Sequence, residues 1–497
     1  MLRVLGSPKR LCDGLSRRDL MQVGGAAFGG LALPQLLQSH ASAAGGATAD
    51  SFGRAKQCIV LFLYGSPSQL ETFDMKPEAP AEIRGTMQPI ASSLPGLDVC
   101  EHLPHLARVM DKTTVIRSVV HPYPIHGVAY AMTGIPIIDV AMELNPRDVG
   151  HHPYFGSCVE YLDRPQRPRE ASAAQNVALP FPFSSKRSDQ PYRAGPYASY
   201  LGAAYDPLWT EFIGEGTRSC VNARPGFRWE GLEPYLGCTR DSHFRLAAVE
   251  GGSGMVLDRM NKRRSLAEQF GDARRDLDRS LVGSSMSQFE KMAYQLLASP
   301  EVGEALDVRN EPESVRDLYG MTLFGQSCLA ARRLIESGTR LVSVFWDEFG
   351  LAGDAWDTHY EHFPRMVDQL LPGLDLPLSG LLIDLEQRGL LDETLVVLVS
   401  EHGRTPRIQN IPGGGRDHWS RAYSVLMAGG GVTRGNVIGG TDAIAGDVVD
   451  RPISPKSILA TMYHLLGIDP RTHLHDRSGR ELPLVPESAE VIGEALA

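Results

Sequence analysis

The segment Thr394–Trp419, TLVVLVSEHGRTPRIQNIPGGGRDHW, carries the strongest functional signal in this 497-residue chain. It begins with an apolar run, 395–399, which predicts a buried strand. Glu401 and His402 follow this run, and a glycine-rich loop then leads to His418. Ligands of open α/β sheets collect at the carboxyl ends of the strands. A carboxylate and two imidazoles at such a position predict a metal site.

Further polar side chains follow other predicted strands. The apolar run 340–346 leads into a loop with Asp357 and His359, and the run 58–64 leads into Glu71 and Asp74. We expect one of these last two acids to bind metal, and the sequence does not choose between them. The candidate metal ligands are therefore Glu71, Asp74, Asp357, His359, Glu401, His402 and His418. For any single residue, a structural ion pair or a capped turn is the alternative.

The mixture of imidazoles and carboxylates favours zinc or manganese, with calcium or magnesium as alternatives. One ion needs about four ligands, so the number of candidates favours two ions. A pair of ions can activate a water or hydroxyl and stabilise a leaving oxygen. Around them we expect hydroxyl nucleophiles, an imidazole, and arginines that hold an anionic group through charge-assisted hydrogen bonds. These catalytic candidates are Ser68, Thr72, His126, Arg404 and Arg416. A local salt bridge between Arg416 and Asp417 is the alternative for that arginine.

The first 43 residues have the pattern of an export signal. Arg17 and Arg18 precede a Gly/Ala-rich stretch, and Ala41-Ser42-Ala43 matches a cleavage site. We expect export by the twin-arginine pathway to the periplasm or cell surface; an amphipathic surface helix is the alternative. No apolar run of about 18 residues follows, so we expect no transmembrane segment after the signal is removed.

Charge and cysteine content narrow the function further. The chain carries a formal net charge of −10, and removal of residues 1–43, which carry +3, leaves −13. This charge argues against nucleic acid as a partner. An exported chain can form disulfides, and Cys220 with Cys238 is the pair that we consider. Cys58 and Cys328 lie in apolar patterns that predict core thiols.

The alternation of apolar runs with helical patterns predicts an α/β protein. Strands are expected at 58–64, 113–119, 340–346, 395–399 and 423–427, with helices at 315–336, 363–388 and 454–466. The helix 363–388 connects two of these strands as a right-handed βαβ unit. We expect one domain from residue 52 to 497, with about 200–310 as an inserted helical cap or subdomain.

Several motifs resemble one known family. They are the twin-arginine leader, GSPSQLETFDMKP (65–77), WDTH (356–359), SEHGRTP (400–406), GGRDHW (414–419) followed by SVLMAGGG (424–431), and ATMYHLLGID (460–469). Over essentially the whole mature chain they resemble the exported bacterial family called domain of unknown function 1501. The placement of that family in the alkaline phosphatase and sulfatase superfamily implies an α/β/α sandwich with a doubly wound, mostly parallel sheet.

The same resemblance also implies roles for individual residues. Glu401-His402 resembles the Asp-His metal pair of the superfamily, His418 its late histidine ligand, and Asp357 with His359 its mid-chain Asp and His. The chain departs from the pattern in two places. It has Tyr64-Gly65-Ser66 where superfamily enzymes have an Asp after the first strand, and 124–134 lacks a Cys, Ser or Thr at the nucleophile position. A formylglycine sulfatase is therefore not expected.

These observations favour an exported metal-dependent hydrolase of a phosphate or sulfate ester, with a small-molecule or glycan ester as substrate. One alternative is a catalytically silent, metal-stabilised binding protein at the cell surface, which the missing nucleophile favours. A weaker alternative is a mutase or isomerase. Membership of a fold family does not itself supply an activity.

Overall fold

The computed structural model describes residues 51–124, 126, 129–135, 150–166, 174–186, 195–219, 231–246, 300–347, 349, 355–476 and 478–497. The expected leader, 1–43, lies outside these residues, as does the part of the expected insertion from 247 to 299.

The strand β1 (Gln57–Leu63) lies at the centre of a nine-stranded sheet. Parallel strands flank it, β8 (Leu341–Trp346) on one side and β9 (Thr394–Val399) on the other. Every residue of β8 and β9 is buried, as expected of parallel strands that are covered on both faces. Their continuous apolar runs are the reason that the sequence predicts them.

The sheet extends in both directions from these three strands. Beyond β8 the order is β5 (Asn176–Leu179) and β6 (Leu208–Ile213), both parallel, and then the antiparallel strand β7 (His243–Leu246). Beyond β9 the order is β12 (Tyr423–Ala428), antiparallel to both neighbours, then β4 (Thr113–Val119) and its parallel partner β13 (Asn436–Ile438). The sheet is therefore mixed but mostly parallel.

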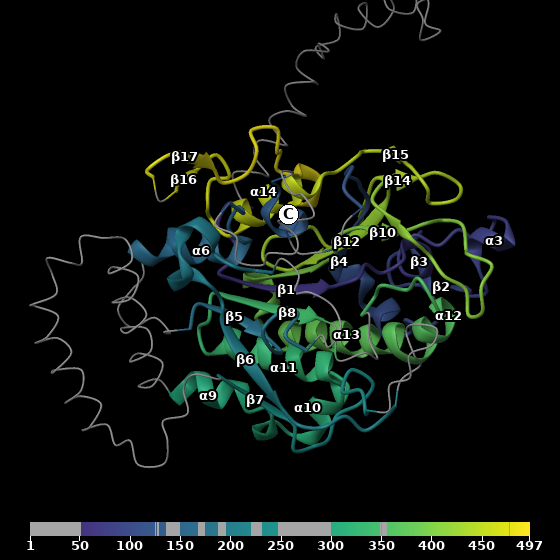
Figure 1. Ribbon diagram of the computed structural model, residues 1–497, viewed down its shortest axis with the longest axis horizontal. Helices are drawn as coiled ribbons and strands as arrows, with labels where there is room; N and C mark the ends of the chain where they lie inside the picture. The colour runs from purple at the N-terminus through teal and green to yellow at the C-terminus, as the bar shows by residue number, and fades with distance from the viewer. Residues whose placement is uncertain are drawn as a thin grey trace, which may run out of the picture.

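Helices cover both faces of the sheet (Figure 1). On one face lie α11 (Leu323–Glu336) and α13 (Leu371–Gln387), with the shorter α9 (Pro300–Leu306) and α10 (Glu313–Leu318). On the other lie α6 (Phe155–Asp163) and α14 (Pro455–Leu465). The short helices α3 (Ala81–Arg84) and α4 (Ala129–Thr133) belong to connecting segments, whereas α12 (His362–Arg365) is the first turn of the helical segment that continues into α13. This arrangement is the predicted α/β/α sandwich.

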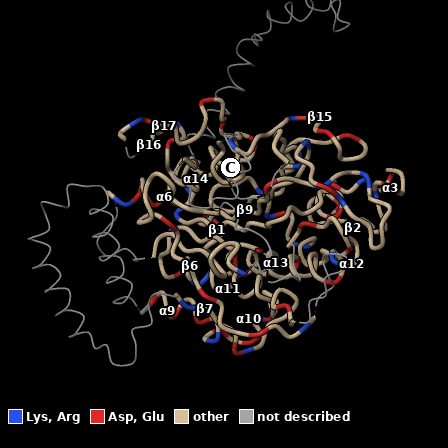
Figure 2. Tube along the Cα trace, viewed as in Figure 1, with Lys and Arg blue, Asp and Glu red and all other residues tan. Residues whose placement is uncertain are grey.

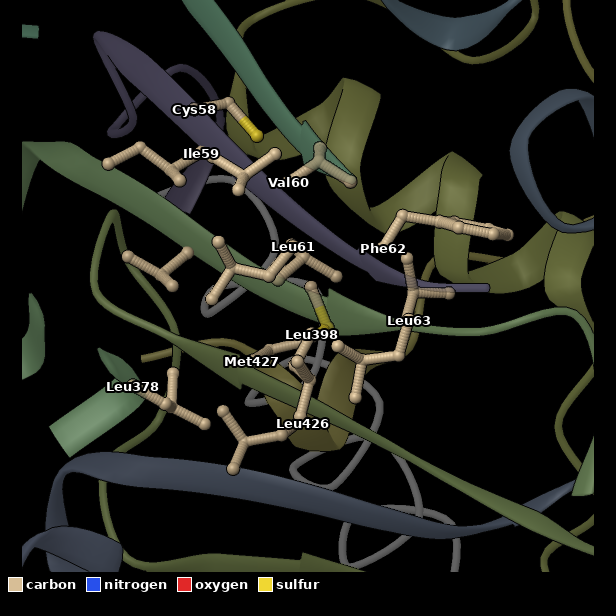
Figure 3. Close-up of a cluster of buried hydrophobic side chains, with 14 of the residues drawn as sticks. Cys58, Ile59, Val60, Leu61, Phe62, Leu63, Leu378, Leu398, Leu426 and Met427 are labelled. Atoms are coloured by element: carbon tan, nitrogen blue, oxygen red, sulfur yellow. The ribbon is translucent and has the colours of Figure 1, made fainter. Parts of the chain in front are cut away.

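The core lies between the central strands and the helices. The side chains of β1 and Leu378 of α13 belong to one buried apolar cluster that also includes Leu398, Leu426 and Met427 (Figure 3). The continuous helical segment His362–Gln387 reaches a mean hydropathy of 1.2, enough for a membrane span by length and composition. However, 72% of its apolar window is buried inside the fold, so it is the central helix of the domain. Along the described part of the chain, positions of Lys and Arg are interspersed with positions of Asp and Glu (Figure 2).

Two expectations need correction. The strands β6 and β7 come from the region expected to form an inserted cap, yet they extend the main sheet, because strand pairing continues past β5. Cys238 is a buried free thiol, which argues against its expected disulfide with Cys220, a residue outside the described ones. Cys58 and Cys328 are fully buried thiols, as predicted.

The end of β1 makes a backbone contact that requires glycine. Gly65 has a φ of +91°, and a Cβ atom added there would lie 2.3 Å from the backbone nitrogen of Asp357. The Trp356 N–H donates a 2.9 Å hydrogen bond to the Tyr64 carbonyl across the same contact. The loop that carries Asp357 is therefore in direct backbone contact with the first strand.

We predict that Gly65→Ala lowers the free energy of unfolding by about 2–4 kcal/mol, because the left-handed conformation and the steric overlap both oppose a side chain. Gly338→Ala is the matched control, since Gly338 has a φ of +89° but nothing within 4 Å of the added Cβ. This control substitution should cost about 1–2 kcal/mol, the cost of the left-handed conformation alone. Urea unfolding of both variants measures the difference, and equal losses would contradict the steric argument.

Candidate metal centre

The candidate ligands follow the carboxyl ends of several strands at one edge of the sheet. Glu401 and His402 follow β9, and the loop with Asp357 and His359 follows β8, which runs parallel to β9 on the other side of β1. His126 comes after β4, which points in the same direction because β12 is antiparallel to both β4 and β9. The hairpin of β10 (Gly403–Arg404) and β11 (His418–Trp419) brings the last histidine beside them.

The first group of possible ligand atoms surrounds Asp357. Its Oδ2 lies 3.0 Å from Nε2 of His126, and its Oδ1 lies 3.1 Å from Nε2 of His359 and 3.4 Å from Nε2 of His418. The two Nε2 atoms of His359 and His418 are 3.1 Å apart. Two nitrogens on one tetrahedral zinc, each at about 2.0–2.1 Å, would be about 3.3 Å apart. The spacing of these imidazoles is therefore compatible with a shared ion.

The second group consists of His126, Glu401 and His402, all of them buried. Nδ1 of His126 lies 2.9 Å from Oε1 of Glu401, so this imidazole stands between the two carboxylates of the centre. Within each group the ligand atoms lie within 4.8 Å of one another. We call the two groups together the metal group: His126, Asp357, His359, Glu401, His402 and His418.

Outer hydrogen bonds orient three of the imidazoles. Nδ1 of His402 bonds to the Gly403 carbonyl at 2.9 Å, and Nδ1 of His418 bonds to the Pro124 carbonyl at 3.1 Å. Nδ1 of His359 bonds to the carboxylate of Asp417 at 2.8 Å. Carbonyls and carboxylates accept a proton from Nδ1, so in the neutral form of each imidazole Nε2 keeps a lone pair that faces the metal group. Nε2 of His402 is buried without a hydrogen-bond partner, as a metal-binding nitrogen would be.

Electrostatics assign opposite states to two of the imidazoles. Burial disfavours the charged form of His126, but the carboxylates of Asp357 and Glu401 outweigh it and raise its pKa to about 9. Burial, together with the positive charges of His126 and Arg404, holds the pKa of His402 well below its ordinary value. In the metal-free chain at neutral pH, His126 therefore carries a proton between the two acids, whereas His402 stays neutral.

The structure assigns Arg404 a role other than the expected anion binding. Its fully buried guanidinium donates to the carbonyls of Gly65, Ser66 and Arg416. Its Nη1 also pairs with Oδ1 of Asp357 at 2.7 Å. Burial raises the pKa of Asp357, but this guanidinium and His126 outweigh burial and hold the pKa well below its ordinary value. Arg404 therefore holds a candidate ligand in place instead of reaching toward a substrate.

Arg416 and Glu71 form a separate cluster with His362. Nη2 of Arg416 lies 2.5 Å from Oε1 of Glu71, and Oε2 of Glu71 lies 3.3 Å from Nε2 of His362. The other nitrogen of His362 bonds to Thr358, in the loop that carries Asp357. Glu71 is therefore not brought to the metal group, and Arg416 is not free to bind an anion, because these two buried charges neutralise each other.

The remaining candidates of the first loop also lie elsewhere. Asp74 pairs with Lys76 at 2.9 Å and Arg117 at 3.5 Å, so its charge is already balanced. The Thr72 hydroxyl donates to the Ser68 carbonyl, and Ser68 is buried beside Glu71. Among the described residues, no hydrogen bond links either hydroxyl to the metal group. Neither is therefore brought into position as a nucleophile.

Sequence reasoning did not identify two residues that orient the metal group. The sequence offers Asp417, the partner of His359, only as a salt-bridge partner of Arg416, although its position directly before His418 is a usable signal. Ser66 accepts a hydrogen bond from the backbone N–H of His402. Its role depends on a left-handed backbone conformation that no sequence pattern marks.

The fold and the site together define an α/β protein with a candidate metal centre at the carboxyl edge of its sheet. The chain matches the family described as "Protein of unknown function (DUF1501)" over residues 55–496, and it belongs to that family. No curated protein matches its sequence significantly.

Solved structures that match this chain in overall fold include the following three. The PsFucS1 sulfatase from Pseudoalteromonas sp. is 11% identical, with a TM-score of 0.38, covering 86% of this chain and 72% of that one. The phosphonate monoester hydrolase SpPMH from Silicibacter pomeroyi is 10% identical, with a TM-score of 0.30, covering 88% and 76%. BT4656, solved with its substrate D-glucosamine-2-N,6-O-disulfate, is 9% identical, with a TM-score of 0.31, covering 89% and 82%. The family assignment rests on the sequence match alone.

The cluster of Glu71 makes stability depend on pH. Burial alone would raise the pKa of Glu71, but Arg416 and His362 outweigh it and lower the pKa from 4.5 to about 2. The stabilisation is therefore present above pH 4.5 and disappears as the pH falls toward 2. We predict that Glu71→Gln loses about 3 kcal/mol of unfolding free energy at pH 7, and that its deficit relative to wild type shrinks between pH 4.5 and 2. Denaturant unfolding at several pH values measures this, and a constant deficit would contradict it.

Proposed function

We propose that this protein is an exported, metal-dependent hydrolase of a phosphate or sulfate ester. The observation that carries the proposal is the metal group, in which two sets of ligand atoms meet at His126. Asp357, His359 and His418 would hold one ion, and Glu401 with His402 would hold the other. The donor set suits zinc or manganese. Bound ions would polarise the ester and lower the pKa of a water molecule, which is the chemistry that such a pair supplies.

Within the described part of the chain, the more exposed imidazoles of the metal group lie together at one end. The side chains of His359 and His418 are 32% and 24% exposed, whereas Glu401 and His402 are buried. An ester would therefore approach from the side of His359 and His418. Because the guanidinium groups of Arg404 and Arg416 are buried and paired inside the protein, the bound ions would bind the anionic group.

The substrate would be a small-molecule or glycan ester found outside the cytoplasm. This part of the proposal is supported by the twin-arginine pattern of residues 1–43, which predicts delivery to the periplasm or cell surface. The net charge of −13 after removal of that segment disfavours nucleic acid as a partner.

A catalytically silent, metal-stabilised binding protein is the second candidate. The observation that favours it is the position of Ser68 and Thr72, whose hydroxyls are not linked to the metal group within the described part of the chain. Hydrolysis would then need water as the attacking group. A mutase or isomerase is a weaker third candidate, since it would need a second anion-binding subsite.

We predict that protein purified from its native export route contains two equivalents of zinc or manganese, and that His402→Ala/His418→Ala loses them. The rate of phosphate or sulfate ester hydrolysis should fall together with the metal content. Because the two substitutions remove ligands themselves, the loss should exceed the roughly 100-fold maximum that is typical when a residue behind a metal ligand is replaced. Elemental analysis and turnover assays measure both effects.

His152→Ala is the matched control, because His152 is a largely buried histidine that bonds to the carbonyls of Pro153 and Pro483. It should keep both metal and turnover. No transition metal in wild-type protein would overturn the metal centre. Bound metal without turnover of any ester would favour the binding protein.

A further inference from the structure

Ser66 combines a left-handed backbone with complete burial. Its φ is +71°, a conformation that opposes every side chain, and it directly follows Gly65, which has a φ of +91°. Glycine would adopt this conformation without strain. Two other non-glycine residues with positive φ, Ala355 and Glu361, border the loop that carries Asp357. Such outliers persist where the surrounding structure imposes them, and they concentrate at functional sites.

The hydroxyl of Ser66 connects to both residues of the second ligand group. Its Oγ accepts the backbone N–H of His402 at 3.2 Å and lies 3.1 Å from Oγ of Ser400. Oγ of Ser400 in turn lies 3.1 Å from Oε2 of Glu401. The contacts therefore form a continuous path from the turn after β1 to the tip of β9.

The direction of the hydrogen bonds between Ser66, Ser400 and Glu401 follows from which groups can donate. An ionised carboxylate only accepts hydrogen bonds, and each hydroxyl donates one. The single proton of the Ser400 hydroxyl is therefore directed at Oε2 of Glu401 and shared with Oγ of Ser66, which also accepts the backbone N–H of His402. The other oxygen of Glu401, Oε1, accepts the Gly65 N–H at 2.8 Å. The turn Gly65–Ser66 thus orients both carboxylate oxygens of Glu401 as well as the backbone of His402.

We propose that Ser66 is a positioning residue for the half of the metal centre formed by Glu401 and His402, and that its hydroxyl is the reason a serine occupies this left-handed position. The inference rests on the proposed metal function and names a residue on which that function depends. Ser66 acts through Ser400 and the His402 backbone.

Two substitutions at Ser66 separate the effect of losing the hydroxyl from the effect of the strained backbone conformation. S66A removes the hydroxyl and keeps a side chain in the left-handed conformation, whereas S66G removes the hydroxyl and relieves the strain. S199G is the matched control, because Ser199 also has a positive φ, +46°, and its side chain makes no hydrogen bond within the described part of the chain. The metal-free full-length mature protein and each variant are titrated with Zn²⁺ against a competing chelator, and their urea unfolding midpoints are compared.

Both S66A and S66G should bind one of the two zinc equivalents roughly 10–100-fold more weakly than wild type, the range for outer residues of metal sites. S66A should also unfold at a lower urea concentration than S66G. S199G should bind both equivalents as wild type does. Wild-type affinity of S66G for both equivalents would overturn the positioning role and leave the metal centre intact. A wild-type protein that binds no zinc or manganese would instead overturn the proposed function.

Discussion

A single guanidinium, that of Arg404, joins the loops that carry the candidate ligands. It is fully buried and bonds to the carbonyls of Gly65, Ser66 and Arg416 and to the carboxylate of Asp357. These partners come from the turn after β1, the glycine-rich loop and the loop after β8, while Arg404 itself follows β9. A buried charge without partners costs several kcal/mol. The loops are therefore held in the positions where their carbonyls and the Asp357 carboxylate bond to the charged guanidinium of Arg404.

Ion pairs also fix the positions of residues around and within the metal group. Behind the metal group, Glu71 is paired with Arg416 and His362, and the other ring nitrogen of His362 bonds to Thr358 between two candidate ligands. Within the metal group, protonated His126 stands between Asp357 and Glu401. In the metal-free chain, the positive charge of protonated His126 partly replaces the charge that bound cations would supply. Binding of cations should therefore release protons.

The two halves of the metal group have different surroundings. Glu401 and His402 are buried and are fixed by the turn Gly65–Ser66, whereas His359 and His418 lie on loops at the partly exposed end. Burial of one half favours a tightly held ion, because its ligands lose little freedom on binding. Exposure of the other half leaves room for a ligand to approach. This asymmetry suits a centre with one mainly structural side and one side that faces substrate.

The sequence by itself determined the central strands and several of the side chains that gather at one edge of the sheet. Parallel strands that are buried on both faces consist of nearly continuous apolar residues, so β1, β8 and β9 could be predicted from their apolar runs. Loops that follow parallel strands meet at one edge of the sheet, which is why Asp357, His359, Glu401, His402 and His418 could be proposed together. The tertiary structure decided which partner each charge has. Glu71 and Arg416 are 345 positions apart, and only the folded chain brings them together away from the metal group. Likewise, the left-handed turn that brings Ser66 to His402 depends on contacts between β1 and β9 that no local pattern encodes.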